Sequence, residues 1–385
     1  MGKLSNMLSR DMLKGSNPMR NRCEIVLSRF NYLWMKVGIV VTCTMIILIA
    51  LDWFFKCSNV IITSRIDINN LITSMRFNAT TFDVIERNST CYLDDDPFSI
   101  RVLPKEYLNE RGCEKRLPSA IIIGGNNCRT NDLTFYLRHH PHIVFPKSTS
   151  IEYFDKFFDL PLSWYRNQMP FSLQNQITME STSSYLTSSK APFRVHDALL
   201  SSNLKFIVVA CDPVIRALRD FKQQQEEEIN WLNATLAEKL FPFHETFMSC
   251  IFKPNGELQT QCPLLFHGNY LQHLLKWMQY FSSQNFIVVN EEDVIFKPFR
   301  VLQKIEHFIG IPNYFQFDDF KFDLNVGSYC LKTNNRCISS SKDEELPKLS
   351  PDITRKLRQY FLNSDKVIQN IFDVRLPWLK NETVP

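Results

Sequence analysis

The chain has 385 residues and a formal net charge of +4, from 44 Lys and Arg against 40 Asp and Glu. Its 44% hydrophobic and 13% aromatic content, with 31 Phe and only 10 Gly, is that of a folded protein, which excludes a disordered chain, a collagen-like fibre and a basic nucleic-acid-binding tail. Eleven Cys are too few for a disulfide scaffold and more than most cytosolic proteins carry, so the redox compartment must be inferred from other signals.

An apolar run near the N-terminus predicts a membrane anchor. From Val37 to Leu51 every residue is apolar, small or Thr, and aromatic residues extend the run on both sides. The resulting segment, 34–55, has roughly 20 residues, enough for a transmembrane helix. In residues 1–33 Lys and Arg outnumber the acidic residues Asp11 and Glu24, which favours a cytoplasmic location. The segment is also too long for the leader of a cleaved signal peptide, the alternative. We therefore expect a type II signal-anchor, with the rest of the chain in the lumen.

The segment 56–116 is polar and has no sustained hydrophobic period, so we expect a lumenal stem. The sequons, predicted glycosylation sites that all lie beyond the apolar run, are Asn78, Asn88, Asn233 and Asn381. Nine of the eleven Cys lie on the same side, where disulfides are permitted. The Cys pairs closest in sequence are Cys91 with Cys113, Cys250 with Cys262, and Cys330 with Cys337. Their spacing leaves the connectivity open.

In the remaining segment, 117–385, three short apolar runs each precede a helical pattern. The runs are Ala120–Ile123, Phe206–Ala210 and Phe286–Val289, and the helical patterns begin near Leu133, Ile215 and Pro298. Buried strands that alternate with helices predict one α/β domain with a parallel central sheet flanked by helices. Ligands of such domains bind at the C-terminal ends of the strands.

Two polar clusters are interpreted as structural. Glu291–Asp293 follow the third strand, where a polar loop before the next helix is a simpler explanation than catalytic carboxylates. His139, His140 and His142 lie where a helix meets Pro141, and no carboxylate or Cys nearby completes a ligand set. We therefore expect no metal site.

The loop after the first strand is a candidate anion site, and it reads Gly-Gly-Asn-Asn-Cys-Arg-Thr-Asn over residues 124–131. A loop between a strand and a helix N-terminus binds anions because free backbone N–H groups and the helix dipole face the ligand. No Gly-Lys-Ser/Thr closes this loop, so it is not a Walker loop. An ordinary turn between strand and helix stays an open alternative.

From Leu117 nearly to the C-terminus the chain resembles the heparan sulfate glucosaminyl 3-O-sulfotransferases, which are Golgi type II membrane proteins that use the sulfate donor PAPS. The motifs that carry the resemblance include Leu117–Gly124, Tyr153–Asp155, Trp164–Arg166, Ile177–Glu180, Asp212–Val214 and Tyr329–Lys332. The resemblance implies a P-loop-like sulfotransferase fold, a Golgi membrane location and a disulfide between Cys330 and Cys337. It also implies transfer of sulfate from PAPS to a glucosaminyl residue of heparan sulfate or a similar glycosaminoglycan, with no role for nucleic acid.

Several charged site residues of that family are replaced in this chain. The family's loop Lys falls on Asn127, and the Gly pair after it falls on Cys128 and Arg129. The family's catalytic Glu falls on Ser150, or on Glu152 if the alignment shifts by two residues.

The positions that hold the nucleotide and the substrate are also changed. The family's Arg and Ser for the 3′-phosphate fall on Cys211 and Arg219, and its substrate Lys falls on Ser181. The resemblance thus assigns the donor site to Asn127, Cys128, Arg129, Thr130, Asn131, Cys211, Arg219, Tyr329 and Lys342. It assigns the substrate side to Ser181, Thr182 and Ser184.

These replacements make the expected donor site more negative than the family pattern, although the donor is a polyanion. Losing one charge-stabilising group typically costs about 10²–10³ in rate. Arg129 and Arg219 add positive charge and offer a rebuilt phosphate site, since Arg binds phosphate through two parallel hydrogen bonds. Two interpretations stay open: a PAPS-dependent sulfotransferase, or a catalytically weak or inactive relative that binds a glycan or a partner enzyme.

Cys128 and Cys211 suggest a further hypothesis. Both are expected directly after strands that flank the donor site, so a disulfide between them would close that site. Two unpaired small residues that fill space are the alternative.

Overall fold

The computed structural model describes residues 90–93, 98, 101–199, 203–231, 243–333, 336–337 and 346–382. The expected tail 1–33 and membrane segment 34–55 lie outside these residues, as do Asn78, Asn88, Asn233 and Lys342. Asn381 belongs to the C-terminal 3-10 helix η6 (Pro377–Glu382). Within the described part of the chain, no helix is long and apolar enough to cross a membrane. The described residues belong to one compact unit, Ile85–Pro385.

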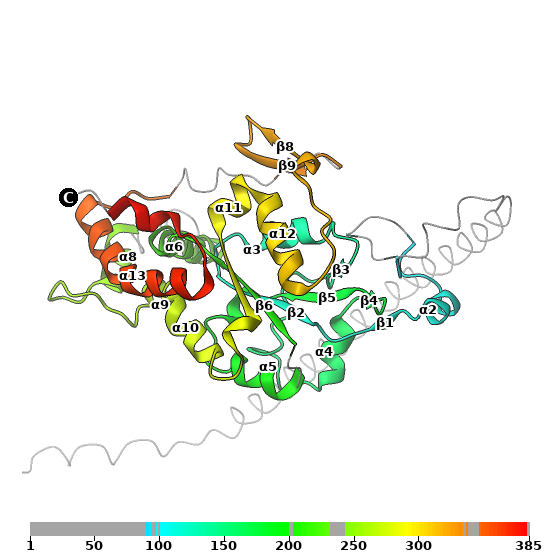
Figure 1. The fold of residues 1–385 in the computed structure, drawn as a ribbon. Coiled ribbons are helices and arrows are strands. Elements are labelled where there is room, and N and C mark those ends of the chain that lie inside the picture. Colours follow the sequence, from blue (N-terminus) through cyan, green and yellow to red (C-terminus); the bar gives the residue numbers. More distant parts are fainter. Residues whose placement is uncertain are drawn as a thin grey trace, which may run out of the picture. The chain divides into compact units, whose positions relative to one another are not determined.

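A five-stranded parallel sheet forms the centre of this unit, with the strand order β3-β5-β2-β6-β7 (Figure 1). The strands are β2 (Ala120–Gly124), β3 (Ile143–Val144), β5 (Ile177–Ser181), β6 (Lys205–Ala210) and β7 (Phe286–Asn290). The three strands expected from the sequence are β2, β6 and β7, and they lie side by side. Nearly all their side chains are buried, as their continuous apolar runs require. The predicted α/β fold class is therefore confirmed.

Helices cover both faces of this sheet, with α3 and α12 on one side and α5 and α10 on the other (Figure 1). The helices nearest the sheet are α3 (Thr130–Leu137), α4 (Leu162–Gln168), α5 (Ala191–Leu199), α10 (Tyr270–Trp277), α11 (Glu291–Phe296) and α12 (Pro298–Ile309). Helix α12 shows how the sequence determines where a helix begins and ends. Pro298 occupies its first turn, where no backbone donor is lost, and Gly310 ends it with a φ of 78°.

Four further helices pack into a second hydrophobic cluster beside the sheet. They are α6 (Pro213–Trp231), α8 (Phe243–Ile251), α9 (Pro263–Phe266) and α13 (Pro351–Phe372). The disulfide Cys250–Cys262 connects α8 to the residue before α9. Arg216 on α6 is fully buried and pairs with Asp220 one turn later at 2.9 Å. Arg216 also donates to the Leu264 carbonyl, which joins α6 to α9.

Part of the segment expected to be a stem packs on the domain. It contains α2 (Lys105–Arg111) and β1 (Glu114–Lys115), and β1 pairs with β4 (Phe171–Ser172). The disulfide Cys91–Cys113 lies in a small hydrophobic cluster that includes Leu108 and is packed against Phe171 and Leu173. The compact part of the chain therefore begins before Leu117.

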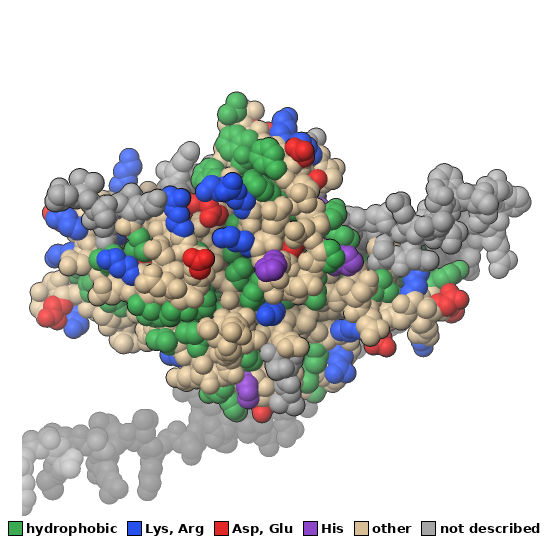
Figure 2. All heavy atoms as spheres, in the orientation of Figure 1, with side chains coloured by type: hydrophobic (Ala, Val, Ile, Leu, Met, Phe, Trp, Pro, Cys, Tyr) green, Lys and Arg blue, Asp and Glu red, His purple; other side chains and the backbone are tan. Residues whose placement is uncertain are grey.

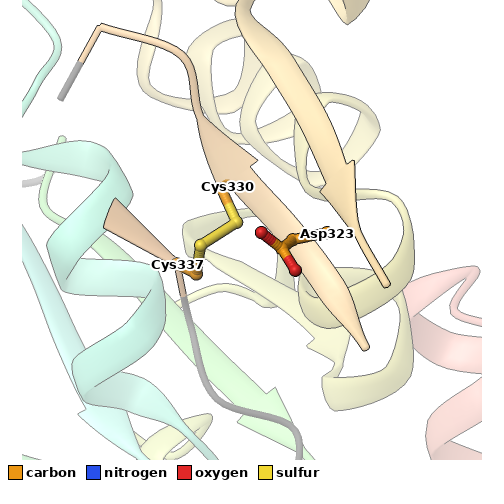
Figure 3. Close-up of side chains that lie close together, drawn as sticks. All are labelled: Asp323, Cys330 and Cys337. Carbon is orange, nitrogen blue, oxygen red and sulfur yellow. A yellow bond between two sulfur atoms is a disulfide. The ribbon is translucent and has the colours of Figure 1, made fainter. Parts of the chain in front are cut away.

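A small antiparallel sheet carries the fourth disulfide. It consists of β8 (Phe320–Asp323), β9 (Ser328–Leu331) and β10 (Arg336–Cys337), and Cys330 is bonded to Cys337 (Figure 3). The Asp323 carboxylate lies beside the two sulfur atoms (Figure 3). Metal binding by Cys needs a thiolate, which a disulfide does not offer, so this cluster is structural. Hydrophobic side chains gather on the surface over β8 and β9 (Figure 2).

Candidate functional site

Two features shape the loop between β2 and α3: close packing around its backbone, and residues with left-handed backbone conformation. A Cβ atom added to Gly124 would lie 2.6 Å from the Leu186 Cβ, so only Gly fits there. Asn127 and Arg129 have φ values of 61° and 58°, a conformation that favours Gly. Arg129 falls on one of the two Gly positions of the family that the sequence resembles. Arg129 thus has a backbone conformation that favours Gly, but it places a guanidinium group at this position of the loop.

The hypothesised disulfide between Cys128 and Cys211 is present. The two Cα atoms are 5.3 Å apart, and both residues are fully buried. The Tyr270 hydroxyl donates a hydrogen bond to the Cys211 carbonyl at 3.0 Å and lies 3.2 Å from the Cys128 Sγ. The alternative of two unpaired residues is therefore wrong. The bond joins the loop after β2 to the end of β6, the two places expected to hold the donor.

Arg129 and Arg219 lie at this loop and share one carboxylate. Arg219 donates two hydrogen bonds to Glu291, at 2.7 and 3.1 Å, and a third to the Asn127 carbonyl at 2.8 Å. The Arg129 Nε lies 3.6 Å from the same Glu291 Oε1, and its Nη1 is 3.1 Å from Asp132. The side chains of Arg129, Arg219 and Glu291 are only 7, 12 and 10% exposed. The positive charge of the loop is thus matched by nearby carboxylates.

Asn127, at the position of the family's Lys, also faces a carboxylate. Its side-chain amide donates to Asp220 Oδ1 at 2.8 Å. Burial alone would raise the pKa of Asp220, but His267 and Arg216 hold it below its usual range. Asp220 therefore stays ionised, and it is already paired.

The residues expected on the substrate side lie at the end of β5. Ser181 and Thr182 are buried, and Thr182 donates to Glu180 at 2.7 Å. Tyr165 and Tyr185 also donate to Glu180, which is fully buried. Burial raises the pKa of Glu180, while these three hydrogen bonds act against the rise. Glu180 and its partners form a closed polar cluster beneath the site.

A second carboxylate lies closer to the loop. Ser184 donates to Asp155 Oδ2, and the neighbouring Ser183 donates to Asn126 of the loop at 3.1 Å. The other oxygen of Asp155 is buried and has no hydrogen-bond partner among the described residues. Burial raises the pKa of Asp155 above its ordinary value. A desolvated carboxylate of this kind is suited to accept a proton.

Other expected site residues lie elsewhere. Ser150 is exposed, and its carbonyl accepts a hydrogen bond from Ser148. Glu152 pairs with Lys156 at 2.8 Å, so its carboxylate is also engaged. Tyr329 lies on β9, with its ring against Phe322 at 5.2 Å. Of the two expected base positions, Ser150 thus offers no carboxylate and Glu152 offers one that is paired with Lys156. Lys342 lies outside the described residues.

The remaining two candidate residues begin the following helix. Thr130 is the first residue of α3 and is buried, and its carbonyl accepts a hydrogen bond from Thr134. Asn131 follows it and is exposed. Both lie at the start of α3, directly after the loop.

Sequence reasoning missed the role of Glu291. We interpreted Glu291–Asp293 as a polar loop, but Glu291 is buried and contacts both arginines of the loop. The available signal was its position, because it directly follows β7 and so lies at the same sheet edge as the other strand ends. Asp155 was noted only as part of a motif, and its isolation from water could not be inferred from sequence.

The chain is similar to known sulfotransferases. A family model described as "Sulfotransferase domain" matches residues 126–376. Human heparan sulfate glucosamine 3-O-sulfotransferase 5 is 29% identical over 280 residues, which cover 71% of this chain and 78% of that protein. Human heparan sulfate glucosamine 3-O-sulfotransferase 6 is 31% identical over 253 residues, which cover 64% and 69%. A sulfotransferase structure from Alicyclobacillus acidocaldarius matches 69% of this chain and 99% of its own, with 16% identity and a TM-score of 0.46.

Proposed function

The chain belongs to the sulfotransferase domain family, and within it to the heparan sulfate glucosamine 3-O-sulfotransferases, and we propose that it transfers a sulfuryl group from PAPS to a glucosamine residue of heparan sulfate or a similar glycan. We further propose that it acts in the Golgi lumen, anchored by segment 34–55. The observation that carries the proposal is the pair of arginines, Arg129 and Arg219, placed at the loop between β2 and α3.

These arginines supply what a phosphosulfate donor needs. A guanidinium fork binds phosphate oxygens through two parallel hydrogen bonds. The Arg219 side chain is already fixed to the loop through the Asn127 carbonyl, so its position does not depend on the ligand. In this proposal Arg129 and Arg219 replace the Lys and Arg that the related enzymes use, and the donor lies across the ends of β2 and β6.

The chemistry requires one bond to form and one to break. The sugar hydroxyl oxygen attacks sulfur while the S–O bond to the nucleotide phosphate breaks, and the hydroxyl proton passes to a base. Ser150 cannot accept this proton at neutral pH. Asp155 is our candidate, because it accepts a hydrogen bond from Ser184, in the 3-10 helix η2 (Ser183–Tyr185) after β5, and its pKa is raised by burial. The product nucleotide leaves with the electron pair of the broken bond.

A specific observation favours a second candidate function. Glu291 and Asp132 neutralise the two arginines, and the Cys128–Cys211 bond restrains the loop. A site that is already neutral attracts a polyanion less strongly than a basic one. The second candidate is a catalytically weak relative that keeps the scaffold to bind a glycan or a partner enzyme.

Calorimetric titration with adenosine 3′,5′-bisphosphate, the product of the donor, separates the two candidates. The first predicts micromolar binding by the full chain in detergent, lost in Arg129→Ala, and transfer of radiolabelled sulfate to an N-sulfated heparan acceptor. Absence of nucleotide binding at millimolar concentration would overturn PAPS dependence. The exposed Arg355, which is distant in sequence and pairs only with Asp352 among the contacts described, provides a matched control as Arg355→Ala.

The proposed location has its own test. Glycosidase treatment of the protein from membranes should increase its gel mobility, and Asn78→Gln or Asn88→Gln should remove part of that shift. Protease added outside intact Golgi vesicles should leave the segment after residue 55 protected. Digestion of that segment in intact vesicles would contradict the proposed topology.

A further inference from the structure

We propose that Glu291 is an internal ligand of the anion site formed by Arg129 and Arg219, and that it determines how tightly this site binds the phosphate groups of the donor. This inference rests on the proposed function, since it concerns the same site. It assigns a specificity-determining role to a residue outside the loop between β2 and α3.

The contact geometry is that of a carboxylate held as an anionic ligand. Both Glu291 oxygens accept hydrogen bonds from the Arg219 fork, at 2.7 and 3.1 Å, and the Arg129 Nε lies 3.6 Å from Oε1. All three side chains are nearly buried. Charge-assisted bonds of this kind are among the strongest that proteins form, and a phosphate or sulfate would use the same donors. The carboxylate and an external anion therefore compete for one fork.

Glu291 reaches this site from a different element than the arginines do. Arg129 belongs to the loop after β2 and Arg219 to α6, whereas Glu291 is the first residue of α11, directly after β7. The amide side chain of Asn290 caps α11 by accepting from the Asp293 backbone N–H at 2.8 Å. This cap fixes the start of α11 and hence the position of Glu291. The carboxylate can thus be replaced without altering the loop itself.

Removal of its negative charge should have two opposite effects. The pair of arginines loses its buried counter-ion, which destabilises the folded protein in the absence of anions. The same two guanidinium groups then have one negative charge less beside them, although Asp132 still pairs with Arg129, so they should bind phosphate or sulfate more tightly. Added anion should therefore restore the stability that the substitution removes.

Glu291→Gln tests this directly, because Gln keeps the size and one oxygen acceptor. The matched control is Glu292→Gln, which removes the neighbouring, exposed carboxylate. We expect Glu291→Gln to bind adenosine 3′,5′-bisphosphate at least tenfold more tightly than the unmodified chain, and Glu292→Gln to change binding less than threefold. The double variant Glu291→Gln/Arg219→Gln should lose the gain. Titration calorimetry measures the nucleotide affinities.

A second readout uses inorganic sulfate, which requires no nucleotide recognition. The melting temperature of Glu291→Gln should be lower than that of the unmodified chain without sulfate and should rise more steeply as sulfate is added. If Glu291→Gln gains sulfate binding and neither form binds the nucleotide, the inference holds and PAPS dependence fails. If the unmodified chain binds the nucleotide and Glu291→Gln binds it equally or less well, the proposed function stands and the inference is overturned. No gain with either anion also overturns the inference.

Discussion

At the scale of single residues, two carboxylates near the site, the buried Glu180 and the partly buried Asp155, differ in how fully they are hydrogen-bonded. Glu180 accepts hydrogen bonds from Tyr165, Thr182 and Tyr185, so both of its carboxylate oxygens have hydrogen-bond partners. Asp155 accepts from Ser184 with one oxygen, while the other is buried without a partner in the described part of the chain. A buried polar atom without a partner in a native protein calls for an explanation, and a reactive role is one. This difference supports the proposal that Asp155 is the base, while Glu180 has a structural role.

The first prediction follows from this difference. Asp155→Asn should lower the rate of sulfate transfer by about 10²–10⁴, the usual contribution of a general base, with little change in nucleotide affinity. Burial raises the pKa of Asp155, and a base acts only when deprotonated, so activity should fall with decreasing pH at a higher pH than for an ordinary Asp. Radiolabelled sulfate transfer measured from pH 4 to 8 checks both points. Ser150→Ala is the control, and equal losses in the two variants would exclude the role of Asp155.

A second residue-scale prediction concerns His273, which is fully buried on α10. Burial lowers its pKa to about 4, whereas an unfolded His titrates near 6.5. Between these values the unfolded chain binds the extra proton, so the free energy of unfolding should fall as the pH drops from about 6.5 to 4. The expected slope is about 1.4 kcal/mol per pH unit.

Urea unfolding at pH 7 and pH 5 measures this effect. The unmodified chain should lose about 2 kcal/mol more than His273→Leu over that interval, because Leu has no proton to bind. The comparison concerns the change with pH, so the stability that His273→Leu loses at both pH values cancels. The same pH dependence in both proteins would show that His273 does not titrate as described.

Sequence predicted some of these residues and missed others for physical reasons. Cys128 and Cys211 could be paired because both follow strands of one parallel sheet, whose ends meet. Glu291 follows such a strand too, but a charged residue there has many possible partners, and only the fold brings Arg219 within hydrogen-bond reach. The burial that raises the pKa of Asp155 depends on packing between elements distant in sequence.

At the scale of whole elements, the hydrophobic pattern of the sequence predicted the long elements of the fold but not the short ones. The strands β2, β6 and β7 are buried on both faces, so they appear in the sequence as continuous apolar runs. The short strands β1 and β4 have only two residues each, and their pairing depends on tertiary contacts that no local pattern encodes. This is why the packed part of segment 56–116 was not anticipated.

The disulfides give a prediction at the element scale. Cys128–Cys211 closes a separation of 83 residues and joins two strand ends, whereas Cys330–Cys337 spans 7 residues within one small sheet. A disulfide restricts the unfolded chain more strongly when it closes a longer loop. This effect predicts that Cys128–Cys211 stabilises the fold by about 4.5 kcal/mol and Cys330–Cys337 by about 2.4 kcal/mol. Replacing both Cys of each pair by Ala should therefore lower the melting temperature more for Cys128 and Cys211.

Differential scanning calorimetry of the two double variants, under non-reducing conditions, tests this order. Intact mass measured before and after thiol labelling confirms that the other bonds remain. Equal melting temperatures, or a larger loss on removal of Cys330–Cys337, would mean that chain restriction does not dominate and that local packing does.

At the scale of the whole molecule, the near balance of charge is also found at the site. The surface mixes basic and acidic side chains on the face seen in Figure 2. The buried site repeats this balance, because Glu291 and Asp132 lie against Arg129 and Arg219. If a polyanionic donor binds at such a charge-balanced site, its anionic groups must replace the internal carboxylates as partners of the arginines. Long-range attraction by a basic surface then contributes little to binding.

The extent of the compact unit gives the last prediction. A fragment that begins at residue 86 keeps the disulfide Cys91–Cys113, whereas one that begins at Leu117, the boundary expected from sequence, lacks it together with β1. The shorter fragment leaves Phe171 and Leu173 without the cluster that covers them. Burial of a few apolar side chains is worth about 3 kcal/mol at roughly 25 cal/mol per Å², so its melting temperature should be lower by roughly 6–12 °C.

Calorimetry of the two secreted fragments measures the difference, and hydrogen exchange locates it. Amides of β4 and of the start of β5 should exchange faster in the shorter fragment, because the backbone pairing of Glu114 with Ser172 is lost. Amides of β6 and β7 lie beyond β5 and β2 in the strand order and should keep their protection. If both fragments melt together and exchange alike, residues 90–116 contribute nothing to the fold, and the domain begins at Leu117 as the sequence indicates.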